Sequence, residues 1–265
     1  MDINFLKQNG VDTDKALELF GDMDIYNETF QDYLDGIDEK LSNLKRSKDN
    51  ENWQDYGIFA HSIKSDARYL GFTKEAEIFL QHEMAGKQEN QHFIEKEYDN
   101  LLKTVSYMTS IVKRYLSGEK ALSRMPEPEV RPVINTVVSP LEDVVLIVDD
   151  SKIVDNFALK VMDGMYKGVV ALDGKEAIDI ISSNKYNILA ILLDLNMPNV
   201  GGFEVLDYLK NSNHYSKIPI SIITGEDSKD MIDKAFKYNI VDMLVKPFSK
   251  SDFLRVLDKT INLNK

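Results

Sequence analysis

The chain has 265 residues, 43% of them hydrophobic and 29% charged, which is enough for two domains with buried cores. It contains no cysteine, which excludes disulfides and thiolate chemistry, and its net charge of −12 disfavours direct binding to nucleic acid. No apolar run approaches the ~20 residues of a membrane-spanning helix, and the N-terminus lacks the pattern of a signal peptide. We therefore expect a cytoplasmic protein without membrane insertion.

The first part of the chain, residues 1–117, has the periodicity of helices. Helices are predicted over 13–21, 25–47, 51–70, 73–86 and 90–116. Asp12 is placed to cap the first of these, and Gly71 to end the third in a left-handed turn. Long helices joined by short loops predict a four-helix bundle with an added N-terminal piece.

A proline-rich stretch over 118–142 separates this region from residues 143–265. It holds four of the seven prolines, namely Pro126, Pro128, Pro132 and Pro140. Proline without a period, mixed with Glu, Arg and Ser, is typical of an extended linker. We predict three parts: a helical bundle over 1–117, a linker over 118–142 and a second domain over 143–265.

The second domain alternates short apolar runs with amphipathic helices. Strands are predicted over 144–148, 167–171, 188–193, 219–223 and 240–245. Helices are predicted over 152–163, from 174, and over 201–211, 228–238 and 250–262. Strict alternation indicates a parallel five-stranded sheet with helices on both faces. The fold class is therefore multidomain, α plus α/β.

Four of these strands, the first, third, fourth and fifth, end in polar residues, and ligand sites of parallel sheets lie at the carboxyl ends of the strands. The polar residues are Asp149, Asp150, Asp194, Thr224 and Lys246. Three carboxylates repel one another unless a cation joins them, and oxygen ligands suit Mg²⁺, with Mn²⁺ as a substitute. An ionised Asp194 is then a nucleophile towards phosphorus, and the metal, Lys246 and Thr224 supply contacts to the phosphoryl oxygens.

The segments LIVDDS, ILLDLNMPNVGGFEVL, IPISIITG and VDMLVKPF resemble the response-regulator receiver family over about 120 residues. The resemblance implies a flavodoxin-like fold with Asp194 as the phosphoacceptor. Asp149 and Asp150 would hold Mg²⁺ together with Asp194 and the backbone carbonyl of Asn196. Thr224 and Lys246 would bind the phosphoryl group and carry the switch.

The resemblance also assigns roles to three further positions. Met243 stands where the family commonly has Tyr or Phe, so the aromatic part of the usual switch is replaced by a flexible thioether. Asn196 and Glu226, each two residues past a site residue, occupy positions that tune hydrolysis. Their pairing resembles chemotaxis-type receivers and implies a short-lived aspartyl phosphate.

A second reactive group lies on the helix predicted over 51–70. His61, Lys64, Ser65 and Arg68 recur at spacings that share one helix face, opposite the apolar stripe. We expect this face to be largely exposed. Its cations would stabilise a phosphoryl group on the imidazole, and the small Ser65 would let a partner approach. A lone histidine on a helix is more often an ordinary residue, and His82, His92 and His214 are assigned to surfaces.

The segments GVDTDKALELFGDMDIYNETFQDYL and AHSIKSDARYLGF resemble the histidine-phosphotransfer (HPt) family. His61, Lys64 and Gly71 match its core motif, whereas Ser65 replaces a glycine. The resemblance implies that His61 accepts a phosphoryl group and that Lys64 steadies it.

Together these features predict a phosphorelay protein of two-component signalling, a phosphotransfer protein rather than an enzyme. Its expected partners are a sensor histidine kinase and other receiver or HPt proteins. The alternative is an interaction adaptor controlled by the receiver, whose helical domain docks or dimerises and whose His61 is never phosphorylated. The direction of transfer, its intramolecular or intermolecular character and the oligomeric state stay open.

Overall fold

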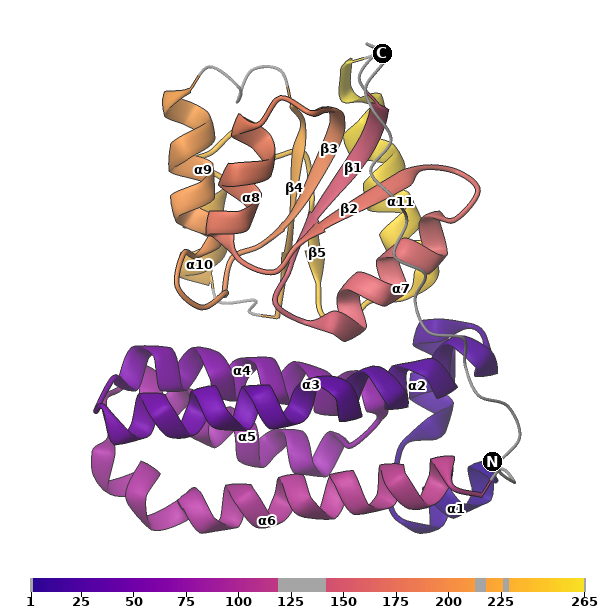
Figure 1. Ribbon diagram of the computed structural model, residues 1–265, viewed down its shortest axis with the longest axis vertical. Coiled ribbons are helices and arrows are strands. Elements are labelled where there is room, and N and C mark those ends of the chain that lie inside the picture. Colours follow the sequence, from indigo (N-terminus) through magenta and orange to yellow (C-terminus); the bar gives the residue numbers. More distant parts are fainter. Residues whose placement is uncertain (1, 119–141, 213–217, 226–228, 265) are drawn as a thin grey trace, which may run out of the picture.

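The computed structural model describes residues 2–118, 142–212, 218–225 and 229–264. The chain forms a helical region followed by an α/β region (Figure 1), so the predicted fold class is confirmed. Residues 119–141, nearly all of the predicted linker, lie outside the described residues, and the division of the chain at 117 and 143 stays a prediction. None of the helices in the described ranges is long and apolar enough to cross a bilayer.

Six helices make up the described N-terminal region. They are α1 (Ile3–Gln8), α2 (Thr13–Phe20), α3 (Met23–Asp49), α4 (Trp53–Leu70), α5 (Thr73–Lys87) and α6 (Gln91–Leu116). Helix α3 packs on α4, α4 on α5, α5 on α6, and α6 again on α3, which closes a four-helix bundle. Helix α1 was not predicted, because six residues are too few to display a helical period.

The ends of these helices follow from local chemistry. The Asp12 carboxylate accepts a hydrogen bond from the Lys15 N–H at the start of α2, as predicted. Asp22 caps α3 in the same way. Gly71 ends α4 with a φ of 86°, a left-handed conformation that glycine adopts without steric cost. These caps fix where the helix that carries His61 begins and ends.

Two glycines let α4 and α5 approach closely. A β-carbon built on Gly86 would lie 2.6 Å from the Cα of Gly57, far inside van der Waals contact. Larger residues at either position would therefore force the helices apart. This close packing brings the side chains of α5 within reach of those on α4.

The α/β region contains one parallel sheet in the order β2-β1-β3-β4-β5. The strands are β1 (Glu142–Val148), β2 (Lys167–Ala171), β3 (Tyr186–Asp194), β4 (Ile220–Thr224) and β5 (Met243–Val245). The helices are α7 (Lys152–Met162), α8 (Gly174–Ser182), α9 (Gly202–Asn211), α10 (Lys229–Ala235) and α11 (Lys250–Ile261). The last strand is shorter than predicted, because the Ile240 N–H bonds the Tyr238 carbonyl in a turn.

Strand β1, which lies between β2 and β3, is buried on both faces, as its continuous apolar run predicts. Val145 and Ile147 belong to the core beneath α7 and α11, whereas Leu146 and Val148 belong to the core beneath α8 and α9. Alternate side chains of one strand thus anchor helices on opposite faces.

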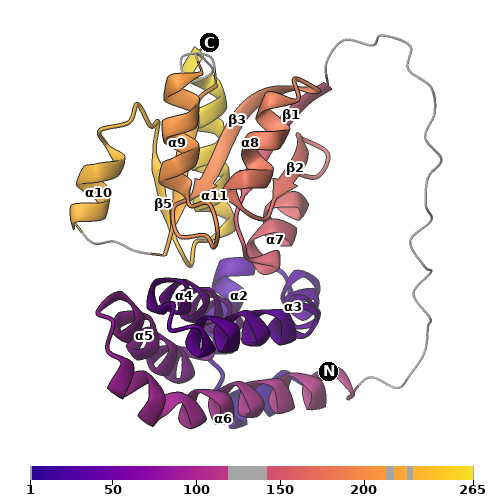
Figure 2. The ribbon, with the colours of Figure 1, turned by 60° about the vertical axis from the view of Figure 1, so that its left-hand side comes forward.

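The carboxyl edge of the sheet faces the helical region. In both ribbon views α2, α3 and α4 lie on the side towards the sheet, and α6 lies on the far side (Figures 1 and 2). Phe20 of α2 meets Phe157 of α7 edge-on, with ring centroids 5.5 Å apart. Tyr69 of α4 meets Phe248 in the same manner at 5.9 Å. The apolar core is therefore continuous between the two regions.

Candidate functional site

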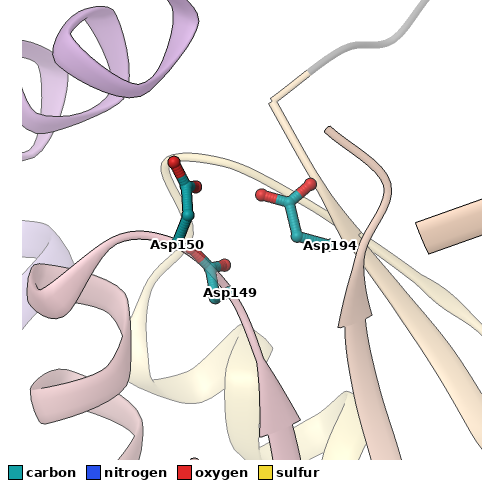
Figure 3. A group of neighbouring side chains, drawn as sticks. All are labelled: Asp149, Asp150 and Asp194. Carbon is teal, nitrogen blue, oxygen red and sulfur yellow. The ribbon is translucent and has the colours of Figure 1, made fainter. Parts of the chain in front are cut away.

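Three carboxylates meet at the carboxyl edge of the sheet. Asp149 and Asp150 follow β1, and Asp194 is the last residue of β3 (Figure 3). Each offers an oxygen within 4.8 Å of the others. The sheet order places β1 beside β3, so residues 45 positions apart in the sequence meet at adjacent strand ends.

Lys246, which follows β5, reaches across this edge. Its Nζ lies 2.7 Å from Asp149 Oδ2 and 2.5 Å from Asp194 Oδ2. The other Asp194 oxygen accepts the Asn196 N–H at 2.9 Å, and Asp149 Oδ1 accepts the Ser151 N–H at 3.0 Å. Asp149, Asp194 and Lys246 are all buried. These bonds fix the orientation of the Asp149 and Asp194 carboxylates. The third carboxylate, Asp150, is partly exposed.

Burial raises the pKa of Asp149 to about 7; Lys246 opposes this shift, and the charges of Asp194 and Asp150 add to it. Burial likewise raises the pKa of Asp150. Burial also disfavours the charge on Lys246, but the carboxylates of Asp149 and Asp194 outweigh it and raise the pKa of the ammonium well above its ordinary value. Ionising all three carboxylates is therefore costly, and a divalent cation would relieve that cost.

The remaining receiver residues take the expected places where they are described. Thr224 ends β4, is fully buried, and its carbonyl accepts the Lys246 N–H at 2.7 Å. Met243 is half-buried at the start of β5 and pairs with Ile222. Glu226 lies outside the described residues. The predicted set therefore converges on the carboxyl edge, apart from Met243, which lies at the opposite end of β5, and Glu226, which is not placed.

Asp155 is a nearby carboxylate that the sequence analysis did not single out. It lies on α7, is 4% exposed, and neither of its oxygens has a hydrogen-bond partner in the described part of the chain. Burial raises its pKa well above the usual range, and the charge of Asp149 adds to the shift. The helical period of the sequence predicts only that Asp155 shares a helix face with buried residues. Its proximity to the acidic cluster depends on the fold, so the sequence could not reveal it.

The expectation that the His61 face is largely exposed is wrong. His61 is 3% exposed, and Lys64 and Ser65 are also buried, whereas Arg68 is half-buried. The α/β region covers this face: Gly225, Lys246 and Pro247 line the same small gap as the four residues of α4. Sequence periodicity describes one helix and cannot predict what a second domain covers.

Glu83 of α5 is a site residue that the sequence analysis missed. Its Oε1 lies 2.9 Å from His61 Nδ1, and its Oε2 pairs with the ammonium of Lys64. Lys87 adds a further ion pair at 2.9 Å. Burial opposes ionisation, but the hydrogen bond and charge of His61 and the charge of Lys64 outweigh it and lower the Glu83 pKa. The sequence held no signal for this contact, which rests on the Gly57–Gly86 crossing.

An ionised carboxylate only accepts hydrogen bonds, so Nδ1 carries the proton that His61 donates to Glu83. Lys64 Nζ, 3.2 Å from Nδ1, is held by the same Glu83 carboxylate. In the neutral form of the ring the lone pair then resides on Nε2, and this nitrogen has no hydrogen-bond partner among the described residues. Nε2 and Cε1 form the edge of the ring that faces Gly225, since a β-carbon built there would lie 2.8 Å from each of them. The imidazole therefore points its nucleophilic nitrogen at the α/β region.

A bridge between the regions runs beside this contact. Asp66 of α4 accepts hydrogen bonds from Ser151 Oγ at 3.1 Å and from Lys40 Nζ at 2.6 Å. Next to it lies a cavity of about 220 Å³ between the regions, whose lining includes Lys40, Asp66, Asp150 and Lys152. Asp150 is thus reachable by a small ion while the regions are in contact.

The other histidines divide between inside and outside. His82 is fully buried and its Nδ1 lies 2.7 Å from the Tyr56 hydroxyl, so its assignment to the surface is wrong. His92 is exposed, as predicted. His214 lies outside the described residues. Helix α5 packs between α4 and α6, and this is why His82 is enclosed.

The parallel five-stranded sheet, with three carboxylates and a lysine at its carboxyl edge, defines the structural class of this protein. Comparison with known proteins identifies the family within that class. Residues 145–258 match the family described as the response regulator receiver domain. The two-component response regulator ORR3 of Oryza sativa is 32% identical over 128 residues, which are 48% of this chain and 95% of that protein. The chain therefore belongs to the response regulator receiver family.

Two further similarities come from Vibrio cholerae. The CAI-1 autoinducer sensor kinase/phosphatase CqsS is 33% identical over 146 residues, which are 54% of this chain. The chain spans only 20% of the length of that protein. The structure of the chemotaxis protein CheY4 has 28% identity and a TM-score of 0.41, and the match covers 45% of this chain and 98% of that one.

Proposed function

We propose that the receiver accepts a phosphoryl group on Asp194 in a Mg²⁺-dependent reaction. The observation that carries this is the buried Asp149–Asp194–Lys246 cluster at the carboxyl edge of the sheet. Asp149, Asp150, Asp194 and the Asn196 carbonyl would hold the ion, with Mn²⁺ as a substitute. Bound there, the ion neutralises charge on the carboxylates and on the phosphoryl oxygens.

In this proposal an Asp194 oxygen forms a bond to phosphorus as the bond from phosphorus to the donor's leaving group breaks, and the leaving group keeps that electron pair. Lys246 and Thr224 bind the phosphoryl oxygens. Thr224, Lys246 and Met243 carry the switch, and Asn196 and Glu226 set the rate of hydrolysis. The chain acts as a phosphoacceptor rather than an enzyme that turns over a separate substrate.

We propose further that the helical region is an HPt domain and that His61 carries the phosphoryl group on Nε2. Support comes from the orientation of the ring: Glu83 holds Nδ1–H, and the free nitrogen faces the receiver. As Nε2 forms its bond to phosphorus, positive charge develops on the ring, and the Glu83 carboxylate stabilises it. Lys64 and Arg68 offer cations to the phosphoryl oxygens, and Ser65 and Gly71 complete the supporting set.

The partners in this proposal are a sensor histidine kinase and other receiver or HPt proteins. The proposed location of the reaction is the cytoplasm. The burial of His61 favours one other candidate, in which the helical region is a docking module that covers the receiver and is never phosphorylated.

The full chain, labelled with radioactive acetyl phosphate and Mg²⁺, tests both parts. Aspartyl phosphate is lost in alkali, whereas phosphohistidine survives alkali and is lost in acid. We expect both kinds of label in the unmodified chain, and His61→Gln should remove only the alkali-stable kind. A chain that takes alkali-labile label alone, with every Mg²⁺ and pH condition tried, would support the docking module and end the HPt proposal.

Glu83→Gln keeps the size of the side chain but removes its charge. We expect the rate of phosphohistidine formation to fall about tenfold, or ~1.4 kcal/mol in activation free energy. Imidazole ¹⁵N–¹H spectra should show the Nδ1–H form of His61 in the unmodified chain and a mixture with the Nε2–H form in the variant. Glu75→Gln, a carboxylate on the same helix with no contact to His61, Lys64 or Arg68 in the described part of the chain, should change neither readout. A Glu83 variant with an unchanged tautomer and rate would reduce Glu83 to a packing role.

A further inference from the structure

Gly225, the residue after β4, touches the imidazole of His61. A β-carbon at this position would lie 2.8 Å from both Nε2 and Cε1 of the ring. Carbon atoms that are not bonded do not approach so closely, since van der Waals contact begins at about 3.5 Å. The backbone of Gly225 does not have the positive φ that would itself favour glycine. The absence of a side chain therefore serves the contact with His61 rather than the local turn.

The imidazole has no room to retreat from an added methyl group. Glu83 holds Nδ1 at 2.9 Å on one side, and the ring is 3% exposed. The gap shared with Lys246 and Pro247 is too small for a water molecule. Either the ring gives up its hydrogen bond or the two domains separate.

In the structure the receiver is docked on the helical domain, and contacts distant from Gly225 also hold the two together. Ser151 bonds Asp66, Lys160 of α7 pairs with Glu28 of α3, and Phe157 packs on Phe20. Each pair joins the face of α7 or the start of that helix to α2, α3 or α4. Polar, charged and apolar contacts thus all join this face of the receiver to the helical domain of the same chain. We take that domain as its partner.

We propose that His61 exchanges phosphoryl groups with Asp194 of its own chain, and that Gly225 is the receiver residue that admits the imidazole. This rests on the proposed function of both domains. In the step, the Nε2 lone pair forms the bond to phosphorus and the bond from phosphorus to the Asp194 oxygen breaks, leaving its electron pair on the carboxylate. The Nδ1 proton stays on the ring, against Glu83.

Transfer within one chain has a kinetic signature. A tethered partner acts at an effective concentration that reaches about the millimolar range, so the reaction is first order and insensitive to dilution. The gap has no room for a water molecule or a phosphoryl group, so the arrangement in the structure is the dephosphorylated one, and it shields Nε2 from other donors. Transfer brings the same two faces together with the phosphoryl group between Nε2 and Asp194, and a methyl group on residue 225 would still lie in the path of the ring.

The test uses the full chain with radioactive acetyl phosphate and Mg²⁺ and measures the ratio of alkali-stable to alkali-labile label over time. Gly225→Ala should lower the initial rate at which this ratio rises about tenfold or more, because the added methyl group blocks docking of the imidazole on the receiver. Gly36→Ala is the matched control at the same interface. A β-carbon there meets nothing closer than the Lys152 side chain at 3.9 Å, so the ratio should stay within about twofold.

A charge reversal tests the docked face without touching the site. Lys160→Glu should slow the appearance of alkali-stable label severalfold by placing two carboxylates together, and Glu28→Lys in the same chain should restore it.

Mixing two variant chains tests whether transfer occurs within one chain. A mixture of His61→Gln and Asp194→Asn chains at about 1 μM should form phosphohistidine at least about 10-fold more slowly than the unmodified chain.

The outcomes separate the two proposals. If the unmodified chain forms no phosphohistidine, the proposed function of the helical domain fails. If it does, but Gly225→Ala and Lys160→Glu leave the ratio unchanged or the mixture reacts as fast as the single chain, the proposed function stands and the intramolecular docking fails.

Discussion

Replacement of Asp194 by Asn is expected to lower labelling of the full chain by acetyl phosphate at least about 100-fold, which corresponds to ~2.7 kcal/mol or more in activation free energy. An amide has nearly the size of a carboxylate but is no nucleophile towards phosphorus. The alkali-stable label on His61 should disappear as well, because acetyl phosphate enters the proposed relay through Asp194.

The same substitution should not unfold the receiver. Asp194 is buried beside Asp149, and its charge helps to raise the pKa of that neighbour. Removing one of the crowded carboxylates relieves repulsion, so we expect the thermal midpoint to stay the same or rise. Asp143→Asn, at the exposed start of β1, is the control and should keep full labelling. Label retained by Asp194→Asn would identify another acceptor and overturn the assignment.

Acid is expected to destabilise the helical domain through His82. Burial lowers the pKa of this imidazole from 6.5 to about 4. Its Nδ1 lies 2.7 Å from the Tyr56 hydroxyl, which donates to it in the tautomer that carries the proton on Nε2. A protonated ring would lose that bond. Because the native state binds the proton more weakly than the unfolded state, stability is complete above pH 6.5 and falls as the pH drops towards 4. The loss is about 3 kcal/mol over that interval.

Urea unfolding followed by fluorescence measures this loss in the full chain. Trp53 is the only tryptophan, and it lies at the start of α4 against Tyr56, so it reports on the helical domain. His82→Gln should flatten the dependence between pH 6.5 and 4, whereas His92→Gln, at an exposed position on α6, should leave it unchanged. Equal acid sensitivity in all three proteins would place the titrating group elsewhere.

Most of the helices and strands, and the residues that meet at the carboxyl edge of the sheet, were predictable from the sequence. Alternating apolar runs and amphipathic helices predicted the parallel sheet, because buried strands and two-faced helices leave distinct periods. Because ligands bind at the carboxyl ends of parallel strands, the sequence also predicted that Asp149, Asp194 and Lys246 lie close together. The capping roles of Asp12 and Gly71 were predictable for the same reason, since caps depend on neighbours in the chain.

The surroundings of His61 could not be predicted from the sequence, because they depend on how separate helices and regions pack together. The contact with Glu83 depends on the close crossing of α4 and α5 at Gly57 and Gly86, and helical periodicity is blind to the distance between two helices. The burial of His61 depends on the receiver packing across α4, and the same is true of the contact with Gly225. A period assigns a residue to one face of its own helix, whereas the packing of whole domains decides what covers that face.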